Sequence, residues 1–137
     1  MKMESSAFVA APELIQALEK RSTAIACGAD RVLFHQGDSP AGLYILNQGE
    51  TTLTMTSPSG EQIMSIQVQA GSLLGLSGLI SDSPYTLSAV ASSGARLSFV
   101  PRDEFTSLMH TNSLLAFKML EVLAAEVRSA RSALSSD

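Results

Sequence analysis

Residues able to form a binding site concentrate in one central stretch, from Leu74 to Ala91. A short apolar strand is followed by a glycine-bearing turn, about one helical turn, a Ser-Pro break and an alternating strand. Because the first amides of a helix have no internal partner, this order predicts a small phosphate pocket made of backbone N–H groups and hydroxyls. The candidate ligand-binding residues are Leu74, Gly75, Leu76, Ser77, Gly78, Pro84, Tyr85, Thr86 and Ser88.

This stretch resembles the phosphate-binding cassette of cyclic nucleotide-binding domains in Crp/Fnr (catabolite activator-type) regulators. The matching positions are Gly75, Leu79, Ile80, Pro84, Thr86 and Ala91. Three further motifs look like the family's: residues 31–38 (RVLFHQGD), 42–50 (GLYILNQGE) and 70–72 (AGS). The order and spacing of these motifs carry the resemblance, which runs roughly from Thr23 to Leu134.

Two positions depart from the family pattern. Leu76 stands where the resemblance places a glutamate on the ribose hydroxyl, and Tyr85 where it places an arginine on the cyclic phosphate. Hydrogen bonds to charged groups contribute roughly 1.5–3 kcal/mol each, so losing both would cost on the order of two to four decades in affinity. We therefore expect no tight binding of cyclic AMP or cyclic GMP in the usual mode.

Other donors remain, since Tyr85 has a phenol, Ser77, Thr86 and Ser88 have hydroxyls, and the turn has its amides. A cyclic nucleotide held differently, or another small phosphate-bearing ligand, is the candidate cofactor. The alternative is that residues 75–78 only connect a strand to a helix and bind nothing.

Bulk composition narrows the function further. The chain has 137 residues, 45% hydrophobic content and a net charge of −4, which fits one globular domain without a basic surface for nucleic acid. A single cysteine, Cys27, with no signal-like or membrane-spanning run, predicts a cytoplasmic protein. Cys27, His35 and His110 are too scattered to predict a metal site, and no catalytic arrangement is present.

The spacing of apolar residues predicts mainly β structure with flanking helices. Residues 1–11 are expected to be a loose leader, and residues 12–137 a single domain that begins with a helix over residues 12–20. Short alternating segments from about 23 to 100 predict an antiparallel β-roll, or jelly roll. These segments are residues 23–27, 32–34, 43–46, 52–56, 63–68, 86–91 and 97–100. In the fourth of them, Leu53 and Met55 should face inward.

Helices are predicted from about 102 to 134, with Thr111 or Asn112 capping the long one. Its apolar residues form a heptad seam at Ala116, Leu120, Leu123, Val127, Ala130 and Leu134, which predicts a homodimer interface. In this frame Glu126 of one chain would lie beside Arg131 of the other. Leu115, Met119 and Val122 form a second row that should pack on the roll. The alternative is a monomer whose helix covers only its own roll.

Together these features predict a regulatory or sensory module that signals through its dimer or a protein partner. In the family, ligand entry shifts the last helices, and an attached effector, often a DNA-binding winged helix, reads the change. The sequence ends at Asp137, where such a domain would begin. Three functions therefore remain open: the sensor part of a transcription regulator, an active cyclic nucleotide receptor, and a ligand-free interaction scaffold.

Overall fold

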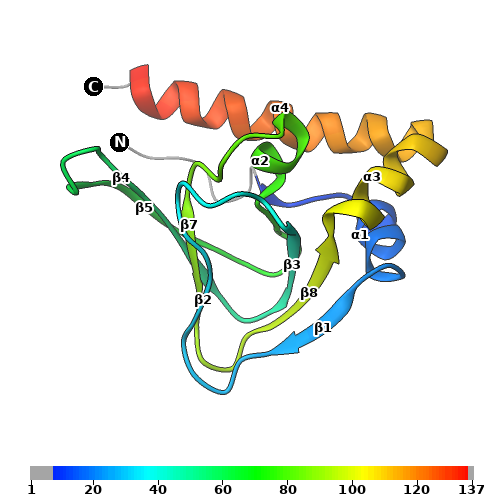
Figure 1. Ribbon diagram of the computed structural model, residues 1–137, viewed down its shortest axis with the longest axis horizontal. Coiled ribbons are helices and arrows are strands. Elements are labelled where there is room, and N and C mark those ends of the chain that lie inside the picture. Colours follow the sequence, from blue (N-terminus) through cyan, green and yellow to red (C-terminus); the bar gives the residue numbers. More distant parts are fainter. Residues whose placement is uncertain (1–7, 136–137) are drawn as a thin grey trace.

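The computed structural model describes the backbone of residues 8–135 and the side chains of residues 8–129. Eight strands form two four-stranded sheets, which curve around a shared interior as a roll (Figure 1). Every strand pairing between named strands is antiparallel. The predicted antiparallel β-roll with flanking helices is confirmed.

The chain passes back and forth between the two sheets. The first has the order β1 (Thr23–Ala26), β8 (Arg96–Pro101), β3 (Gly42–Gln48) and β6 (Leu73–Leu74). The second has the order β2 (Arg31–Phe34), β7 (Ser88–Ala91), β4 (Thr51–Thr56) and β5 (Gln62–Val68). Among the described strands, β4 and β5 are the one pair of consecutive strands in the same sheet. The strand expected from residue 86 begins at 88, because the backbone of Tyr85 is bonded elsewhere: its N–H donates to Asp38 and its carbonyl accepts from Gly37.

Alternation along β3 separates two apolar clusters, since successive side chains point to opposite faces of a strand. Leu46 faces the inside of the roll, whereas Leu43 and Ile45 face the helices. The roll-interior cluster contains Phe8, Cys27, Phe34, Leu46, Leu53, Met64, Val68, Leu74, Tyr85, Ala89, Ala91, Ala95 and Leu97. The helix-side cluster contains Ala10, Leu14, Leu18, Leu43, Ile45, Leu73, Leu76, Leu79, Val100, Phe105, Leu108, Leu115, Met119 and Val122.

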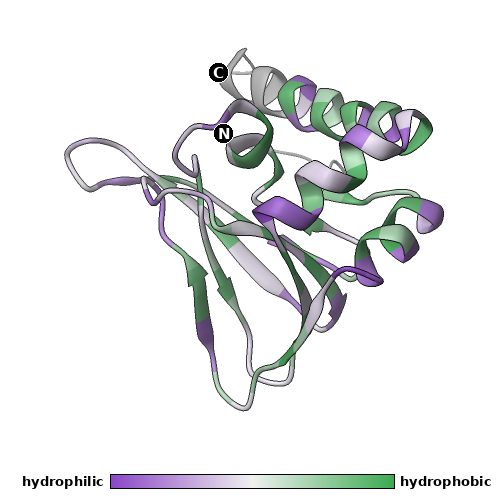
Figure 2. Cartoon of the chain, turned by 45° about the vertical axis from the view of Figure 1, so that its right-hand side comes forward, coloured by the Kyte–Doolittle hydropathy of each residue, from purple (hydrophilic) through white to green (hydrophobic). Residues whose placement is uncertain are grey.

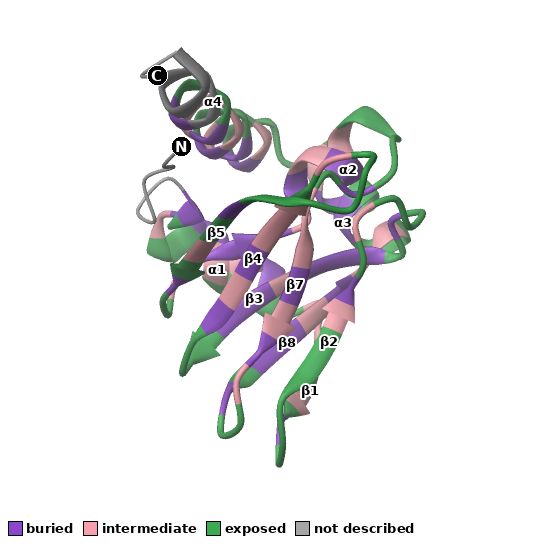
Figure 3. Cartoon of the chain, turned by 90° about the vertical axis from the view of Figure 1, so that its left-hand side faces the viewer, coloured by how far each residue is buried: buried purple, intermediate pink, exposed green. Residues whose placement is uncertain are grey.

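The pattern on β4 agrees with the prediction from the sequence. Leu53 belongs to the roll-interior cluster and Met55 packs against it, while Thr52 and Thr54 are half-buried and Thr56 is exposed. Figure 3 shows this mixture of buried and half-buried residues along the second sheet.

Four helices complete the described part of the chain: α1 (Pro12–Glu19), α2 (Leu76–Ser81), α3 (Arg102–Thr111) and α4 (Ser113–Ser135). The long helix α4 runs across one end of the roll (Figure 1). The Leu115 amide donates to the Asn112 side-chain oxygen at 3.1 Å, so Asn112 is the predicted cap of this helix. Leu115, Met119 and Val122 are buried in the helix-side cluster, as the second apolar row predicted.

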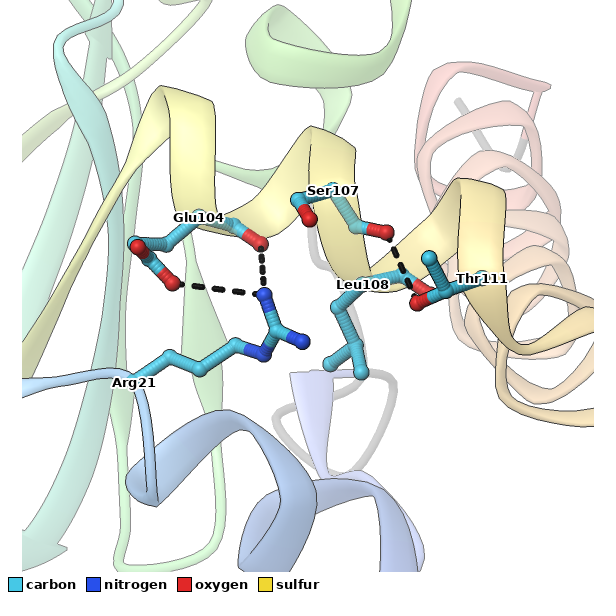
Figure 4. A network of polar contacts seen from close by, with 5 residues as sticks. All are labelled: Arg21, Glu104, Ser107, Leu108 and Thr111. Carbon is cyan, nitrogen blue, oxygen red and sulfur yellow. Dashed lines mark hydrogen bonds and ion pairs between the residues drawn. The ribbon is translucent and has the colours of Figure 1, made fainter.

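Polar contacts fix the start of α4 relative to the roll. Arg21 contacts both the side chain and the backbone carbonyl of Glu104 on α3, and the Thr111 hydroxyl donates to carbonyls in the last turn of α3 (Figure 4). Lys118 on α4 pairs with Glu13 on α1 at 2.9 Å. This contact lowers the pKa of the Glu13 carboxyl, mainly through the Lys118 hydrogen bond.

The predicted leader differs from the structure over residues 8–10. Phe8 and Ala10 are buried, Val9 forms a β-bridge with Ser72, and the Ala10 amide donates to the Gly71 carbonyl at 3.0 Å. Burial of the Phe8 ring in the roll interior explains why this segment packs. Residues 1–7 of the expected leader lie outside the described residues.

Candidate functional site

The glycine-bearing turn of the predicted cassette approaches a tyrosine ring. Gly75 precedes α2 and has a φ of +88°, a conformation that favours glycine. A Cβ at Gly75 would lie 2.8 Å from a ring carbon of Tyr85, closer than any ordinary contact. Gly75 is therefore required both by its backbone conformation and by the ring beside it.

Tyr85 is held firmly inside the roll. Its ring stacks on Phe34, with centroids 4.0 Å apart and planes 22° from parallel. Its hydroxyl donates to the Gly42 carbonyl at 2.7 Å, and burial raises the pKa of the phenol. The phenol proton, which the sequence suggested could be offered to a ligand, is thus used within the fold.

A cavity of about 280 Å³ lies between the roll, α2 and α4. We call it the α4 cavity. Its lining consists of Phe8, Phe34, Leu53, Met55, Leu74, Gly75, Leu76, Ser77, Tyr85, Thr86, Leu87, Leu123, Glu126 and Val127. Six of the nine predicted ligand-binding residues are among them: Leu74, Gly75, Leu76, Ser77, Tyr85 and Thr86.

Gly78, Pro84 and Ser88 do not line the α4 cavity. Gly78 is packed beneath the chain that follows α2, since a Cβ there would lie 3.0 Å from the Ser83 carbonyl. Pro84 is exposed, and the Ser88 hydroxyl accepts a hydrogen bond from the Gln36 amide at 2.8 Å.

Leu76 is buried as well as lining the α4 cavity. Only 1% of its surface is exposed, and it belongs to the helix-side cluster, which also contains side chains of α1, α3 and α4. At the position where the resemblance places a ribose-binding glutamate, this chain therefore has a core side chain.

Among the described residues, the lining of the α4 cavity contains one acid and no base. Its titratable groups there are the Glu126 carboxyl and the Tyr85 phenol, and none of the lysines, arginines and histidines between residues 8 and 129 belongs to it. Glu126 is only 8% exposed, and burial raises the pKa of its carboxyl to about 8. The charged form is disfavoured because the apolar surroundings replace water. At neutral pH the carboxyl is thus mainly protonated.

The structure places the predicted seam of α4 on two different surfaces. Leu120 and Val127 are about half exposed, whereas Leu123 is partly buried against the helix-side cluster and Ala116 is half-buried. Glu126 lies in the α4 cavity and not on the outer surface that the heptad frame gave it. The side chains of Ala130, Arg131 and Leu134 lie outside the described residues, although the α4 backbone extends past them.

Two exposed apolar residues of α4 were not part of the predicted seam. Leu114 and Phe117 are 66% and 67% exposed, and with Leu120 they recur every three residues. Apolar residues recur along the whole described part of α4 (Figure 2). These two positions lie beside the predicted seam and not on its continuation, because a step of three residues back from Ala116 falls on Ser113.

Several cavity residues could not be found from the central stretch alone. Phe8, Phe34, Leu53 and Met55 come from segments that only the roll brings together, while Leu123, Glu126 and Val127 come from α4. Leu87 lies within the central stretch but was not among the nine predicted residues. The alternation on β4 was the available signal for Leu53 and Met55.

No metal centre is present among residues 8–129, where no three His, Cys, Asp or Glu side chains gather. Within the same part of the chain, no helix has the length and apolar content to cross a membrane.

Comparisons with known proteins agree with this geometry. Residues 24–112 match the family model described as "Cyclic nucleotide-binding domain". The cyclic AMP receptor protein of Thermus thermophilus is 28% identical over 98 residues, which are 72% of this chain and 45% of that protein.

Solved structures show the same fold. The crystal structure of the Thermus thermophilus catabolite activator protein superposes with a TM-score of 0.78 and 25% identity, over 90% of this chain and 58% of that one. A transcriptional regulator from Thermotoga maritima has a TM-score of 0.72 and 18% identity, over 90% and 98% of the two chains. The sensor domain of the regulator DNR from Pseudomonas aeruginosa has a TM-score of 0.68 and 19% identity, over 89% and 82%.

Proposed function

Because this chain belongs to the cyclic nucleotide-binding domain family, with relatives of the Crp/Fnr type, we propose that it is a regulatory domain and not an enzyme. We further propose that it does not bind cyclic AMP or cyclic GMP in the family's usual mode, and that it signals as a homodimer through α4. A cytoplasmic location fits this role. The Thermus relative is about twice as long as the part matched here, so DNA binding by a longer protein would be a separate activity.

One observation carries the proposal on ligands: the described lining of the α4 cavity contains a carboxyl and no basic side chain. A cyclic nucleotide brings a negatively charged phosphate, which needs a cation or several aligned donors when it leaves water. Tyr85 stands where the resemblance expects the arginine, and its hydroxyl already donates to Gly42. If Glu126 ionised, its charge would repel the phosphate further.

Titration calorimetry tests this part of the proposal. We expect flat heats when cyclic AMP, cyclic GMP or a cyclic dinucleotide is titrated into the protein at pH 7. Thermal unfolding with each nucleotide provides an independent readout, because a ligand that binds the folded state raises the melting temperature. Binding of cyclic AMP with a dissociation constant of about 1 µM or tighter, some −8 kcal/mol, would contradict the proposal.

The exposed apolar face of α4 supports the proposal of a homodimer. Leu114, Phe117, Leu120 and Val127 are between 47% and 67% exposed in the single chain. An apolar row along one helix favours pairing with a second helix of the same kind, as in a coiled coil. The buried row on the opposite side of α4 holds the helix on its own roll, so the exposed row is free to meet a partner.

Light scattering after size exclusion tests the dimer. We expect a species of twice the 14.4 kDa chain mass for the unaltered protein. Leu120→Asp places a charge in the exposed row and should give the monomer mass. Ser59→Asp, in the exposed turn between β4 and β5, is the matched control and should leave the dimer intact. A monomer mass for the unaltered protein at concentrations near 100 µM, where even weak dimers with −5 to −6 kcal/mol associate, contradicts the dimer.

A further inference from the structure

We infer that the α4 cavity binds an uncharged, largely apolar molecule that presents a paired hydrogen-bond donor and acceptor, such as a lactam or carboxamide, to the Glu126 carboxyl. This inference rests on the proposed function, because it names the ligand class of the same cavity. It goes further by assigning Glu126 as the residue that recognises the ligand.

The apolar lining of the α4 cavity disfavours a charged ligand. Phe8, Phe34, Leu53, Met55, Leu74, Leu87, Leu123 and Val127 supply apolar surface from the roll and from α4. Pockets of this kind are usually lined by apolar side chains, with a few polar groups that fix the orientation of the ligand. Few polar side chains are present here, so each of them can be examined in turn.

Glu126 is the acidic side chain in the described lining of the α4 cavity. It is 8% exposed, and no hydrogen bond or ion pair joins its carboxyl to another described residue. The carboxyl borders the cavity and is not sealed in the core, where the Thr51 hydroxyl is the enclosed side-chain group without a partner among the described residues. A carboxyl in apolar surroundings is stabilised by a hydrogen-bond partner. A molecule in the α4 cavity that bonds to the carboxyl would supply the missing partner.

The protonation state of Glu126 defines what that molecule must offer. Burial raises the pKa of its carboxyl to about 8, so at neutral pH the group has one O–H donor and one carbonyl acceptor. A lactam or primary amide has a carbonyl acceptor and an N–H donor side by side. Its carbonyl can accept from the O–H of the Glu126 carboxyl while its N–H donates to the carboxyl C=O, so the two groups are complementary.

The remaining polar groups at the cavity do not change this requirement. The Tyr85 hydroxyl is engaged with Gly42, and the hydroxyls of Ser77 and Thr86 are neutral donors or acceptors. The charged neighbours on α4, Glu121 and Arg128, line a separate surface groove with Lys118. Between residues 8 and 129, no charged side chain of another element faces Glu126 across the α4 cavity, since Tyr85 is the other titratable lining group in that part of the chain.

The other ligand charges fit this cavity less well. An anion would lie among apolar side chains, and the described lining residues include no cation to pair with it. A basic amine would take the proton of Glu126 and form an ion pair in an apolar site, where desolvation offsets much of the attraction. A neutral molecule avoids both costs.

The size of the cavity suggests a two-ring molecule. Its volume of about 280 Å³ is nearly twice that of an engineered apolar cavity of about 150 Å³ that binds benzene. 2-Quinolinone, a flat bicyclic lactam, is therefore a suitable probe.

Ligand-observed NMR with four compounds of matched size provides the test at pH 6.5. The probes are 2-quinolinone, N-methyl-2-quinolinone, 2-naphthoate and 1-naphthylmethylamine. We expect 2-quinolinone to bind at least tenfold more tightly than the N-methyl compound, which has the same rings but no N–H donor. The anion and the amine should bind more weakly than the lactam.

Variants of Glu126 connect this preference to the residue. Glu126→Gln keeps a donor and an acceptor, so it should bind 2-quinolinone within about threefold of the unaltered protein. Glu126→Leu should lose the tenfold preference for the lactam over its N-methyl form. The binding of 2-quinolinone should weaken as pH rises past about 8 in the unaltered protein and stay constant in Glu126→Gln, because only the carboxyl ionises.

Several outcomes would overturn the inference: tighter binding of the naphthoate or the amine, equal binding of the two quinolinones, or an unchanged preference in Glu126→Leu. Absence of binding by all four compounds would also overturn it. None of these results affects the proposed function, which fails instead if cyclic AMP binds tightly. Circular dichroism of both variants shows whether they are folded, and Glu126→Gln gives a second route if Glu126→Leu is not.

Discussion

The two apolar clusters of this chain differ in composition and in packing: the helix-side cluster is mainly leucine, whereas the roll-interior cluster mixes leucines with aromatic and small residues. The helix-side cluster contains leucines that are 0% exposed, such as Leu14, Leu18 and Leu43, and it joins α1, α3 and α4 to the first sheet. The roll-interior cluster borders a cavity of about 280 Å³. One cluster is filled by the chain itself, whereas the other leaves room for a further molecule.

This difference indicates that the cluster that holds the helices in place is separate from the cavity that we propose to bind a ligand. Close packing transmits strain and tolerates little change, which suits the cluster that fixes the helices. The cavity side carries a feature that costs stability, the buried Glu126 carboxyl. Such local conflicts are expected at functional sites.

The contrast in packing can be tested first with two leucine truncations. Leu43→Ala empties a closely packed position, and we expect a loss of about 4 kcal/mol in the free energy of unfolding. Leu53→Ala enlarges an existing cavity and should cost nearer to 2 kcal/mol, because the side of Leu53 that lines the α4 cavity makes no packing contacts to lose. Urea unfolding of both variants measures the difference. Equal losses would mean that the roll interior is packed as closely as the helix side.

The buried carboxyl predicts an unusual pH dependence. The folded-state pKa of Glu126 is about 8, above its ordinary value of 4.5, so the folded state binds more protons between these two values. Stability should therefore be greatest below pH 4.5 as far as this group is concerned, and fall as pH rises toward 8. At 1.36 kcal/mol per pH unit, the loss between pH 4.5 and 7 is on the order of 3 kcal/mol.

Glu126→Gln sharpens this test, since it removes the ionisation while keeping the shape. The variant should be more stable than the unaltered protein at pH 7 and about equal to it near pH 4.5. Glu121→Gln is the matched control, because Glu121 is exposed on the same helix, and it should leave the pH profile unchanged. A profile that is the same in Glu126→Gln and the unaltered protein would show that Glu126 is not buried as described.

Tyr85→Phe tests the cavity side with a smaller change. The variant keeps the ring on Phe34 but leaves the Gly42 carbonyl without its donor. An unsatisfied buried acceptor costs about 1–3 kcal/mol, and we expect a loss near 1.5 kcal/mol. Thermal and urea unfolding measure it. A neutral result would indicate that water reaches the Gly42 carbonyl.

The smallest effect on stability is expected on the outer face of α4. Phe117→Ser changes a side chain that is 67% exposed, so the unfolding free energy of the isolated chain should shift by less than about 0.5 kcal/mol. The same variant should weaken the proposed dimer. Unfolding at several protein concentrations separates the effect on the single chain from the effect on the dimer, because only the dimer makes the melting temperature depend on concentration.

Much of the fold could be read from local patterns. The strand segments followed from alternation between turns, and Leu53 and Met55 followed from the period of two. The sequence placed the cap of α4 at Thr111 or Asn112, and the structure selects Asn112. These features depend on a few neighbouring residues. The structure adds the two-residue strand β6 and the later start of β7.

The site was predictable only in part, because its character depends on distant segments. Six of the nine candidate residues line the α4 cavity, but Phe8 comes from a segment expected to be loose. The heptad frame treated α4 as an isolated helix and placed Glu126 outside, whereas packing against the roll turns it inward. The partner of the Tyr85 hydroxyl, Gly42, is 43 residues away in the sequence and has no side chain to suggest the contact.

Gly42, Gly75 and Tyr85 are interlocked in a way that constrains how this lineage can change. A Cβ at Gly42 would lie 2.2 Å from the Val100 carbonyl, and one at Gly75 would meet the Tyr85 ring, so neither glycine is free to vary alone. Exchanging Tyr85 for arginine in a single step would remove the ring from Phe34 and the donor from Gly42. A single substitution that introduces a phosphate-binding arginine at this position would therefore destabilise the fold, so the change requires compensating substitutions elsewhere.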